Sequence, residues 1–364
     1  MHIVIDARII SSSTGRYAER LLTYLEKQND NHEYTVLVLK KDVDYWKPTK
    51  SNFRVMVADF PNYSFSEQLG FALLLYRLKA DLVHFCMPQQ PLLYFGKRVT
   101  TVHDLTLVYF DNVDMNPIIY RIRKFIFIRL LKNVVRRSRA ILTPTQYVKD
   151  EIIKFTKESY ADKIVPTHLA WDEAVAEPEV IPKLKGKKFI FFVGNAFPYK
   201  NLHRIVDAFS EVRKTNPDLE LVFAGKKDYF YEQLEKHIKA KGVEVKTHIL
   251  GFISEGEKRW LFRHGQAYII ASFSEGFHIP GLEAMAENCP VISSNATCLP
   301  EVYADAALYF DPNKTDELVE AIQRLLANPK ERNTLINKGA KRLKDFSWAR
   351  MAKKTRQTYD KAAD

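Results

Sequence analysis

The feature that most constrains this chain is the alternation, along most of its length, of short apolar runs with longer amphipathic segments. In the first half the apolar runs predict strands at 3–7, 34–39, 54–59, 81–86, 99–104, 140–145 and 163–169. In the second half they predict strands at 189–194, 219–225, 247–252, 267–272, 289–294 and 307–311. Nearly continuous apolar strands joined by helices form parallel sheets that are covered on both faces. The predicted class is therefore α/β.

The alternation breaks once, at 172–188, where DEAVAEPEVIPKLKGKK contains prolines and charges but little periodicity. We interpret 173–187 as a linker between two doubly wound domains, 1–172 and 188–345. A chain of 364 residues is too long for one ordinary core and accommodates two. Ligands of such sheets bind outside the carboxyl ends of the strands. The predicted site is therefore a cleft across which the two sheets face each other.

Composition limits the cellular location and the class of partner but does not identify a function. The net charge of +11 favours a polyanionic partner, which leaves nucleic acid, acidic lipid and phosphorylated small molecules open. No apolar run is long enough for a membrane-spanning helix, and the N-terminus lacks a signal-peptide layout. Cys86, Cys289 and Cys298 have neither metal nor redox spacing, and no HxxH or HExxH pair occurs. We therefore predict a cytoplasmic protein without a metal site.

A possible anion site lies in the segment VGNAFPYKNL, at 193–202. Lys200 stands just before a predicted helix, where free backbone N–H groups and the helix dipole favour a phosphate. A solvated lysine before a helix capped by Asn201 explains the same pattern equally well. Neither the phosphate-binding loop GxxxxGK[ST] nor the dinucleotide fingerprint GxGxxG is present in this segment.

Two carboxylates, Glu275 and Glu283, stand near a predicted helix start in FSEGFHIPGLEAMAENCPVI, at 273–292. The helix is expected to begin near Gly281 or Leu282, which places Glu283 in its first turn. Three interpretations arise: a general acid and base, two hydrogen-bond acceptors for a polyhydroxyl ligand, or a helix-stabilising acid at Glu283. The last one does not explain Glu275.

The glycines of this segment favour the ligand interpretation. Gly276 and Gly281 lack side chains and so permit a close approach between the backbone and a ligand. The amides around Phe277 and His278 are then available to a phosphate or a sugar.

Two features of the first half point to the same predicted cleft. Gly15 precedes a helix expected to start near Arg16, and His103 with Asp104 follows a predicted strand. A single histidine at that position is as compatible with a structural role as with a functional one.

The segment 117–139 is strongly basic, with eight Lys or Arg between Arg121 and Arg139 and no acid. Interleaved Ile, Phe, Leu and Val make it amphipathic, so it suits an anionic membrane surface. A helix packed on a core with a basic solvent face fits equally well. No recognition motif supports nucleic acid as a partner.

In combination, these motifs resemble the family 4 glycosyltransferases of the "group 1" type over essentially the whole chain. The motifs that carry the resemblance are IDAR…STGRY…LL, TVHDL, AILTPTQYVKDEI, VGNAFPYKNL, HILGFISEGE, SEGFHIPGLEAMAENCPVISSN, LPEVYADAALYFDP and FSWARMAKKTRQTY. The two glutamates with seven residues between them are the most specific of these. The resemblance implies a GT-B fold of two Rossmann-like domains, with a C-terminal helix in 346–364 crossing back to the N-terminal domain.

The resemblance also implies roles for individual residues. Glu275 would bind hydroxyls of a donor sugar, assisted by the amides of Gly276, Phe277 and His278. Glu283 would bind the ribose hydroxyls of the nucleotide.

Lys200 would hold the diphosphate together with the helix start at Gly281–Leu282. His103 would face the donor sugar near the reaction centre, Gly15 would line the cleft, and Phe252 would lie against the base. One position departs from the family pattern: Asn195 stands where many members have an arginine. Because Asn supplies no fixed positive charge, the diphosphate would depend more on Lys200 or on another basic residue.

The implied activity is retaining, metal-independent transfer of a hexose from a nucleotide sugar, with the leaving phosphate taking the acceptor's proton. GDP-mannose is the favoured donor, and the alternatives are rhamnosyl or glucosyl transfer from dTDP or UDP sugars. A sugar-nucleotide epimerase, a phosphorylase or an inactive binding protein of the same fold are the rival classes. The acceptor would be a glycan or a lipid-linked saccharide, reached in the cytoplasm or at the inner face of the membrane through 117–139. No cofactor is expected.

Overall fold

The computed structural model describes residues 1–364 except 13, 62–63, 111–116 and 174. The described chain forms two compact units. Unit 1 comprises Met1–Leu169 and Ser347–Asp364, and unit 2 comprises Ala170–Phe346. The segment predicted as a linker belongs to unit 2. Two hydrogen bonds attach it there: Arg259 donates to the Ala176 carbonyl, and the Glu179 amide donates to the Gly256 carbonyl.

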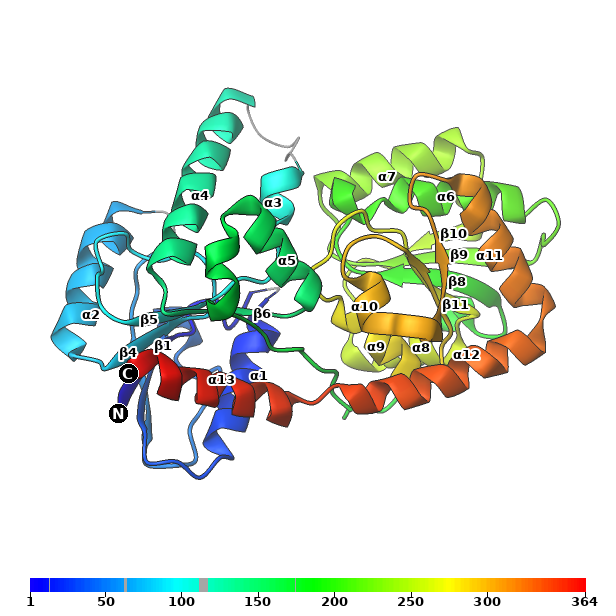
Figure 1. Cartoon of the computed structure of the whole chain (residues 1–364). Helices are drawn as coiled ribbons and strands as arrows, with labels where there is room; N and C mark the ends of the chain where they lie inside the picture. Colours follow the sequence, from blue (N-terminus) through cyan, green and yellow to red (C-terminus); the bar gives the residue numbers. More distant parts are fainter. Residues whose placement is uncertain (13, 62–63, 111–116, 174) are drawn as a thin grey trace. The chain divides into compact units, whose positions relative to one another are not determined.

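Unit 1 is built on a seven-stranded parallel sheet in the order β3-β2-β1-β4-β5-β6-β7 (Figure 1). Its strands are β1 (His2–Asp6), β2 (Glu33–Val38), β3 (Phe53–Val57), β4 (Leu82–Phe85), β5 (Arg98–Thr101), β6 (Ala140–Thr143) and β7 (Ile164–Pro166). The inner strands β1, β4, β5 and β6 are buried along almost their whole length, as expected when helices cover both faces.

The helices of unit 1 are α1 (Gly15–Glu26), η1 (Lys40–Asp42), η2 (Glu67–Phe71), α2 (Ala72–Leu78), α3 (Thr106–Tyr109), α4 (Pro117–Arg137), α5 (Gln146–Phe155), η3 (Glu158–Lys163) and α13 (Trp348–Ala363). The C-terminal helix α13 packs beside α1 (Figure 1). The Tyr359 hydroxyl and Nδ1 of His84 are 2.6 Å apart, and His32 lies 2.9 Å from Asp360. The predicted return of the C-terminal helix to the N-terminal domain is therefore confirmed.

Unit 2 has a six-stranded parallel sheet in the order β10-β9-β8-β11-β12-β13. Its strands are β8 (Lys188–Val193), β9 (Leu219–Ala224), β10 (Thr247–Ile249), β11 (Ala267–Ile270), β12 (Val291–Ser294) and β13 (Ala307–Phe310). Its helices are η4 (Pro182–Leu184), η5 (Pro198–Lys200), α6 (Leu202–Val212), α7 (Tyr229–Ala240), η6 (Glu244–Lys246), α8 (Glu255–His264), α9 (Ile279–Ala286), α10 (Leu299–Tyr303), η7 (Ala304–Ala306), α11 (Thr315–Ala327), α12 (Pro329–Arg342) and η8 (Leu343–Asp345).

Helical periodicity explains how the core of unit 2 forms. In α6 the residues Leu202, Ile205, Val206, Phe209 and Val212 recur at intervals of three and four, share one face and are buried. They join Phe side chains of β8 and β9 in one apolar cluster. The α/β architecture with two parallel sheets predicted from the sequence is confirmed.

The strand order defines where a ligand of unit 2 would bind. The chain passes from β8 to β9 on one side and later enters β11 on the other side, so the strand order reverses between β8 and β11. Ligands of open α/β sheets bind at this switch point, outside the carboxyl ends of the strands. The loops that leave β8 and β11 there carry Lys200 and Glu275.

Candidate active site

The centre of the candidate site is an ion pair between Lys200 and Glu275. Lys200 ends the short helix η5 after β8, and Glu275 lies in the loop between β11 and α9. The Lys200 Nζ lies 2.7 Å from Oε1 and 2.9 Å from Oε2 of Glu275. Their side chains are only 12% and 9% exposed. The two residues, assigned separate roles by the resemblance, therefore share one largely buried contact.

Neighbouring side chains hold Glu275 in place. The Ser272 hydroxyl donates to Oε1 of Glu275 at 2.6 Å, and the backbone amide of Glu275 donates to the Thr297 hydroxyl at 3.1 Å. The Cys298 thiol donates to the Glu275 carbonyl at 3.2 Å. The carboxylate is thus preorganised by residues from the ends of β11 and β12, as a binding group requires.

The electrostatics of the pair keep Glu275 ionised. Burial alone would raise the pKa of this carboxyl, but the Lys200 ammonium and the hydrogen bonds from Lys200 and Ser272 lower it. A general acid at neutral pH needs a raised pKa. The acid interpretation is therefore disfavoured, and an ionised acceptor of hydrogen bonds remains.

Asn201 does not cap α6 with its side chain. It adopts a left-handed conformation with φ of 56°, and its amide donates to the carbonyls of Ala271 and Pro312 at 3.1 and 2.9 Å. The interpretation of Lys200 as a solvated residue before an Asn201 cap is therefore wrong. The asparagine instead joins the η5 loop to the end of β11, which holds Lys200 beside Glu275.

His278 is a buried, neutral residue before α9. The Tyr303 hydroxyl donates to the His278 carbonyl at 2.7 Å and lies 2.9 Å from Nδ1. Because that hydroxyl has one proton, Nδ1 must donate to it, which leaves Nε2 as the acceptor nitrogen. Burial is the main cause that lowers the pKa of His278 to about 4. Its φ of 69° is uncommon outside glycine, and such backbone strain gathers at functional sites.

Helix α9 begins at Ile279, two residues before the first of the predicted starts. Glu283 is consequently the fifth helical residue and lies beyond the first turn, so the explanation of Glu283 as a first-turn acid is wrong. Its Oε1 lies 3.5 Å from Nζ of Lys258, which also pairs with Glu255 at 2.6 Å. The Glu283 side chain is 12% exposed.

Gly281 is required by internal packing. A Cβ added at Gly281 would lie 2.1 Å from the Tyr303 hydroxyl oxygen, so any side chain there would force Tyr303 to move. The prediction that Gly281 serves ligand approach therefore has a competing explanation in the fold itself. Leu282 is fully buried, and Phe277 is 4% exposed and packs edge-on against Phe346 at 5.4 Å. These two side chains anchor the loop to unit 2.

Asn195 and Phe252 follow β8 and β10 at the same edge of the sheet. Asn195 is half-buried, and its side-chain oxygen Oδ1 accepts a long hydrogen bond of 3.4 Å from the Phe197 backbone amide. Phe252 is 89% exposed. The Lys227 side chain, after β9, reaches within 3.8 Å of the Cβ position of Gly251. A lysine therefore lies at this edge, between the ends of β8 and β10.

The predicted residues of unit 1 are His103 and Gly15. His103 follows β5, and its Nε2 lies 2.9 Å from the Cys86 carbonyl, while its ring packs edge-on against Tyr17 at 4.9 Å. Burial lowers the pKa of His103, which favours the neutral ring. Gly15 is the first residue of α1, and a Cβ there would meet the Ile10 carbonyl oxygen at 1.9 Å. The close approach that needs this glycine is to the chain's own backbone.

Several residues of the site were missed by sequence reasoning. Ser272, Thr297 and Tyr303 contact Glu275 or His278, and Lys258 contacts Glu283. Ser272 stands at the end of a predicted strand, directly before the glutamate loop, which is a usable signal. Tyr303 and Lys258 are brought in by other helices, and local sequence carries no sign of those contacts.

Helix α4 departs from the predicted amphipathic pattern, because its apolar residues do not gather on one face. Leu131 and Val134 face the core of unit 1, whereas Ile122, Phe125 and Ile126 are 55–57% exposed. The Arg129 guanidinium lies 4.8 Å from the centre of the Phe125 ring. The outer side of this helix therefore presents apolar side chains among basic ones. The predicted segment extends over 117–139, and α4 ends at Arg137.

In the part of the chain outside the undescribed segments, no helix is both long and apolar enough to cross a membrane. Among the same residues, no group of three or more His, Cys, Asp or Glu side chains is arranged to hold a metal ion.

Comparison with known families adds an independent finding. The family described as "Glycosyl transferases group 1" matches residues 176–342, and "Glycosyltransferase Family 4" matches residues 14–165. An O-antigen chain mannosyltransferase B of Escherichia coli is 28% identical, over 72% of this chain and 70% of the relative. An O-antigen chain mannosyltransferase RfbU of Salmonella typhimurium is also 28% identical, over 66% of this chain and 64% of the relative.

Solved structures agree with the fold along the whole chain. Anabaena Alr3699/HepE in complex with UDP-glucose superposes with a TM-score of 0.77 at 15% identity and covers 99% of both chains. A sucrose-phosphate synthase from Thermosynechococcus elongatus superposes with a TM-score of 0.75 at 15% identity, covering 99% of this chain and 98% of the other. On these matches the chain belongs to the family 4, group 1 glycosyltransferases and is a glycosyltransferase of GT-B fold.

Proposed function

We propose that this enzyme transfers a hexose from a nucleotide sugar to a glycan or lipid-linked saccharide with retention of anomeric configuration. GDP-mannose is the first candidate donor. Two relatives at 28% identity are O-antigen chain mannosyltransferases, and a further one at 28% identity, from Mycolicibacterium hassiacum, is an MMP alpha-(1->4)-mannosyltransferase. These names support mannosyl transfer in polysaccharide or glycoconjugate assembly.

The observation that carries the proposal is the Lys200–Glu275 pair at the strand-order switch point of unit 2. Its ammonium and ionised carboxylate lie within 2.9 Å of each other and are mostly buried. A sugar diphosphate has groups that match both residues: its anionic phosphate oxygens match Lys200, and its sugar hydroxyls can donate hydrogen bonds to Glu275. In the proposal Lys200 holds the diphosphate, and Glu275 holds the sugar hydroxyls with the amides of Gly276, Phe277 and His278.

The remaining donor contacts follow along the same edge of the sheet. Glu283 binds the ribose, and the exposed ring of Phe252 lies against the base. The α9 start near Gly281–Leu282 assists the diphosphate. Asn195 carries no charge, although many family members have an arginine at this position. We propose that Lys227, which lies close to Gly251, supplies the positive charge instead.

The proposed chemistry needs no metal. As the bond from sugar to diphosphate breaks, negative charge grows on the leaving phosphate, and the Lys200 ammonium stabilises it. The leaving phosphate accepts the proton of the acceptor hydroxyl, which attacks from the same face of the sugar. Ionised Glu275 orients the sugar and does not transfer the proton.

Unit 1 is proposed to serve the acceptor. We propose that His103 serves as a neutral hydrogen-bonding group for the donor sugar and that Gly15 belongs to the acceptor side, at the start of α1. The exposed apolar and basic side of α4 supports contact with an anionic membrane surface that carries a lipid-linked acceptor. Binding to anionic vesicles that does not weaken with salt, or no binding at all, would count against the membrane contact.

A thermal-shift panel of nucleotides tests the donor. A ligand at about 100 times its dissociation constant adds about 2.7 kcal/mol of stability. We expect stabilisation by GDP and GDP-mannose and little by UDP or dTDP. Stabilisation by UDP alone would favour the second candidate, a glucosyltransferase. The support for this candidate is the fold that the chain shares with the Anabaena protein solved with UDP-glucose. Product analysis by NMR then gives the anomeric configuration, and an inverted product would refute retention.

A further inference from the structure

A buried network of hydrogen bonds in unit 1 joins the C-terminal helix to the strand that leads to His103. The Tyr359 hydroxyl of α13 lies 2.6 Å from Nδ1 of His84 in β4, and Nε2 of His84 lies 2.9 Å from the Thr101 hydroxyl oxygen in β5. That oxygen also lies 2.7 Å from the Tyr17 hydroxyl of α1. We name these four residues the Tyr359 network: Tyr359, His84, Thr101 and Tyr17.

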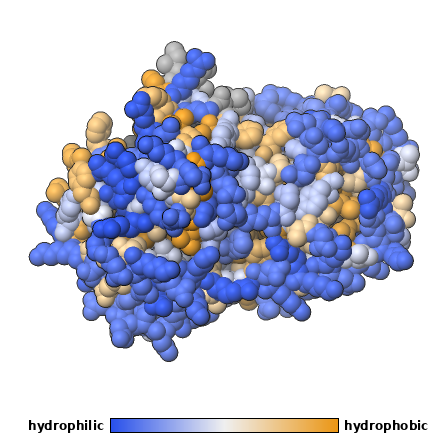
Figure 2. Space-filling view, viewed as in Figure 1, coloured by the Kyte–Doolittle hydropathy of each residue, from blue (hydrophilic) through white to orange (hydrophobic). Residues whose placement is uncertain are grey.

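Four separate elements supply the Tyr359 network, and none of its residues is more than 2% exposed. Helix α13 contacts α1, β4 and β5. The surface over α13 is mostly hydrophilic in Figure 2, as expected of a helix whose buried residues, among them Met351, Thr355 and Tyr359, lie against the rest of unit 1. Because a buried polar group without a partner costs stability, each member of the network depends on its neighbours.

The hydrogen bonds of the network have one direction, because each hydroxyl has one proton and a neutral imidazole has one N–H group. Burial is the main cause that lowers the pKa of His84 to about 3, so its ring is neutral. If Nε2 of His84 donates to Thr101, then Thr101 donates to Tyr17. If Nε2 accepts from Thr101, then Tyr17 donates to Thr101. In either case the Thr101 hydroxyl is the group that connects Tyr17 to the network.

The network ends against His103. The Tyr17 ring packs edge-on against the His103 ring, with 4.9 Å between centres and 78° between planes. Nε2 of His103 lies 2.9 Å from the Cys86 carbonyl oxygen, which can only accept, so Nε2 carries the proton and Nδ1 is the accepting nitrogen. Rotation of the imidazole would break this hydrogen bond, and the packed Tyr17 ring opposes such rotation.

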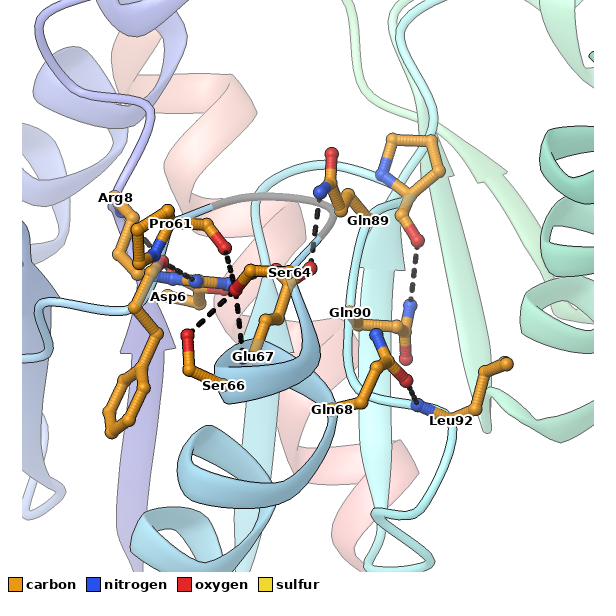
Figure 3. Close-up of polar contacts among 12 residues, drawn as sticks. Asp6, Arg8, Pro61, Ser64, Ser66, Glu67, Gln68, Gln89, Gln90 and Leu92 are labelled. Atoms are coloured by element: carbon orange, nitrogen blue, oxygen red, sulfur yellow. Dashed lines mark hydrogen bonds and ion pairs between the residues drawn. The ribbon is translucent and has the colours of Figure 1, made fainter. Parts of the chain in front are cut away.

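A second buried network in the same strand offers an internal comparison. The Thr100 hydroxyl oxygen lies 3.1 Å from Nε2 of Gln90 and 2.9 Å from the Ser138 hydroxyl. Gln90 also donates to the Pro88 carbonyl at 3.3 Å, within the loop that follows β4 (Figure 3). Successive residues of a strand point to opposite faces of the sheet, so the hydroxyls of Thr100 and Thr101 serve different networks.

We propose that the Tyr359 network positions His103, so that its Nδ1 accepts a hydrogen bond from a hydroxyl of the donor sugar. The inference rests on the proposed function, in which His103 faces that sugar. Tyr17, Thr101 and the other two members are positioning residues, because they are buried and act through the orientation of His103. An acceptor whose orientation is fixed beforehand holds the sugar with less loss of freedom in the transition state.

Initial rates of GDP release from GDP-mannose test the inference, with UDP-glucose as the probe if the nucleotide panel selects UDP. Thr101→Val keeps the side-chain shape but removes the connecting hydroxyl, and it should lower kcat about tenfold with little change in KM. Thr101→Ser keeps the hydroxyl and should recover the rate to within about twofold. Thr100→Val is the matched control: the residue is equally buried in β5, and kcat should stay within about twofold of the wild type.

A double-mutant cycle separates positioning from a general loss of structure. In a His103→Ala background, Thr101→Val should lower kcat by no more than about twofold further, because its effect passes through the missing imidazole. NMR of ¹⁵N-labelled protein gives a readout that needs no substrate. Wild-type His103 should show a protonated Nε2 and an unprotonated Nδ1, whereas Thr101→Val should show a mixture of the two tautomers. Tyr359→Phe, expected to lower kcat about threefold, replaces Thr101→Val in these tests if the latter unfolds.

The opposite outcomes would overturn the inference. A wild-type rate and an unmixed His103 tautomer in Thr101→Val would do so, as would equal losses of rate in Thr100→Val and Thr101→Val. A further tenfold loss in the His103→Ala background would show that the network acts elsewhere, and it would leave the proposed role of His103 intact. A wild-type rate for His103→Ala alone would instead refute that role, and with it the inference.

Discussion

Replacement of Lys200 by alanine is the sharpest test of the proposed mechanism. The change removes the ammonium that lies 2.7 and 2.9 Å from the two oxygens of Glu275, at a site where both side chains are mostly buried. Loss of one preorganised charge that stabilises a leaving group costs about 3–4 kcal/mol in the transition state. The expected fall in turnover is therefore roughly 10²–10³-fold.

The same change must also affect stability. Leaving a buried carboxylate without its partner typically costs about 3–5 kcal/mol, and the Ser272 hydroxyl would remain as a side-chain donor to Glu275. The double variant Lys200→Met with Glu275→Gln removes both charges, so the free energy of unfolding should recover most of that loss. Turnover should not recover, because the diphosphate still lacks its cation.

The assay measures initial rates of transfer from the identified donor at saturating concentration, together with the free energy of unfolding by urea. Lys214→Ala is the matched control: its Nζ lies 2.6 Å from Glu211, but the side chains are 68% and 51% exposed. An exposed pair of this kind contributes at most about 1 kcal/mol. The mechanism is refuted if Lys200→Ala turns over near the wild-type rate, or if the double variant regains activity along with stability.

Three further predictions follow from the site. The pKa of folded His278 is lowered to about 4, whereas the unfolded residue gains a proton as pH falls below 6.5. The unfolded state is therefore favoured by acid, and the free energy of unfolding should drop by about 3 kcal/mol by pH 4. His278→Asn, which tolerates the left-handed backbone, should reduce that acid sensitivity in urea unfolding measured at several pH values, and an unchanged pH slope would contradict the buried neutral histidine. Gly281→Ala should lower stability by about 1–3 kcal/mol because its Cβ meets Tyr303, and an unchanged melting temperature would refute that packing. EDTA should leave the rate of transfer unchanged, whereas a loss that Mg²⁺ restores would disprove metal-independent catalysis.

The fold was largely predictable because it depends on local periodicity. Apolar runs such as 189–194 and amphipathic segments such as 202–212 indicate strands and helices without knowledge of distant residues. Helix ends were less predictable. Helix α9 starts at Ile279, before the expected glycine, because Pro280 fits within the first helical turn and the left-handed His278 precedes it.

The sequence by itself determined the class, the two parallel sheets and the residues that the family resemblance singles out. Only the tertiary structure decided that Lys200 pairs with Glu275, 75 positions away, and that Tyr303 occupies the space beside Gly281. It also decided that Leu69 of η2 and Leu73 of α2 stay exposed. The physical reason is the same in each case. Backbone geometry sets the period of a helix or strand locally, whereas which side chains meet, and which face stays open, depends on how distant elements pack together.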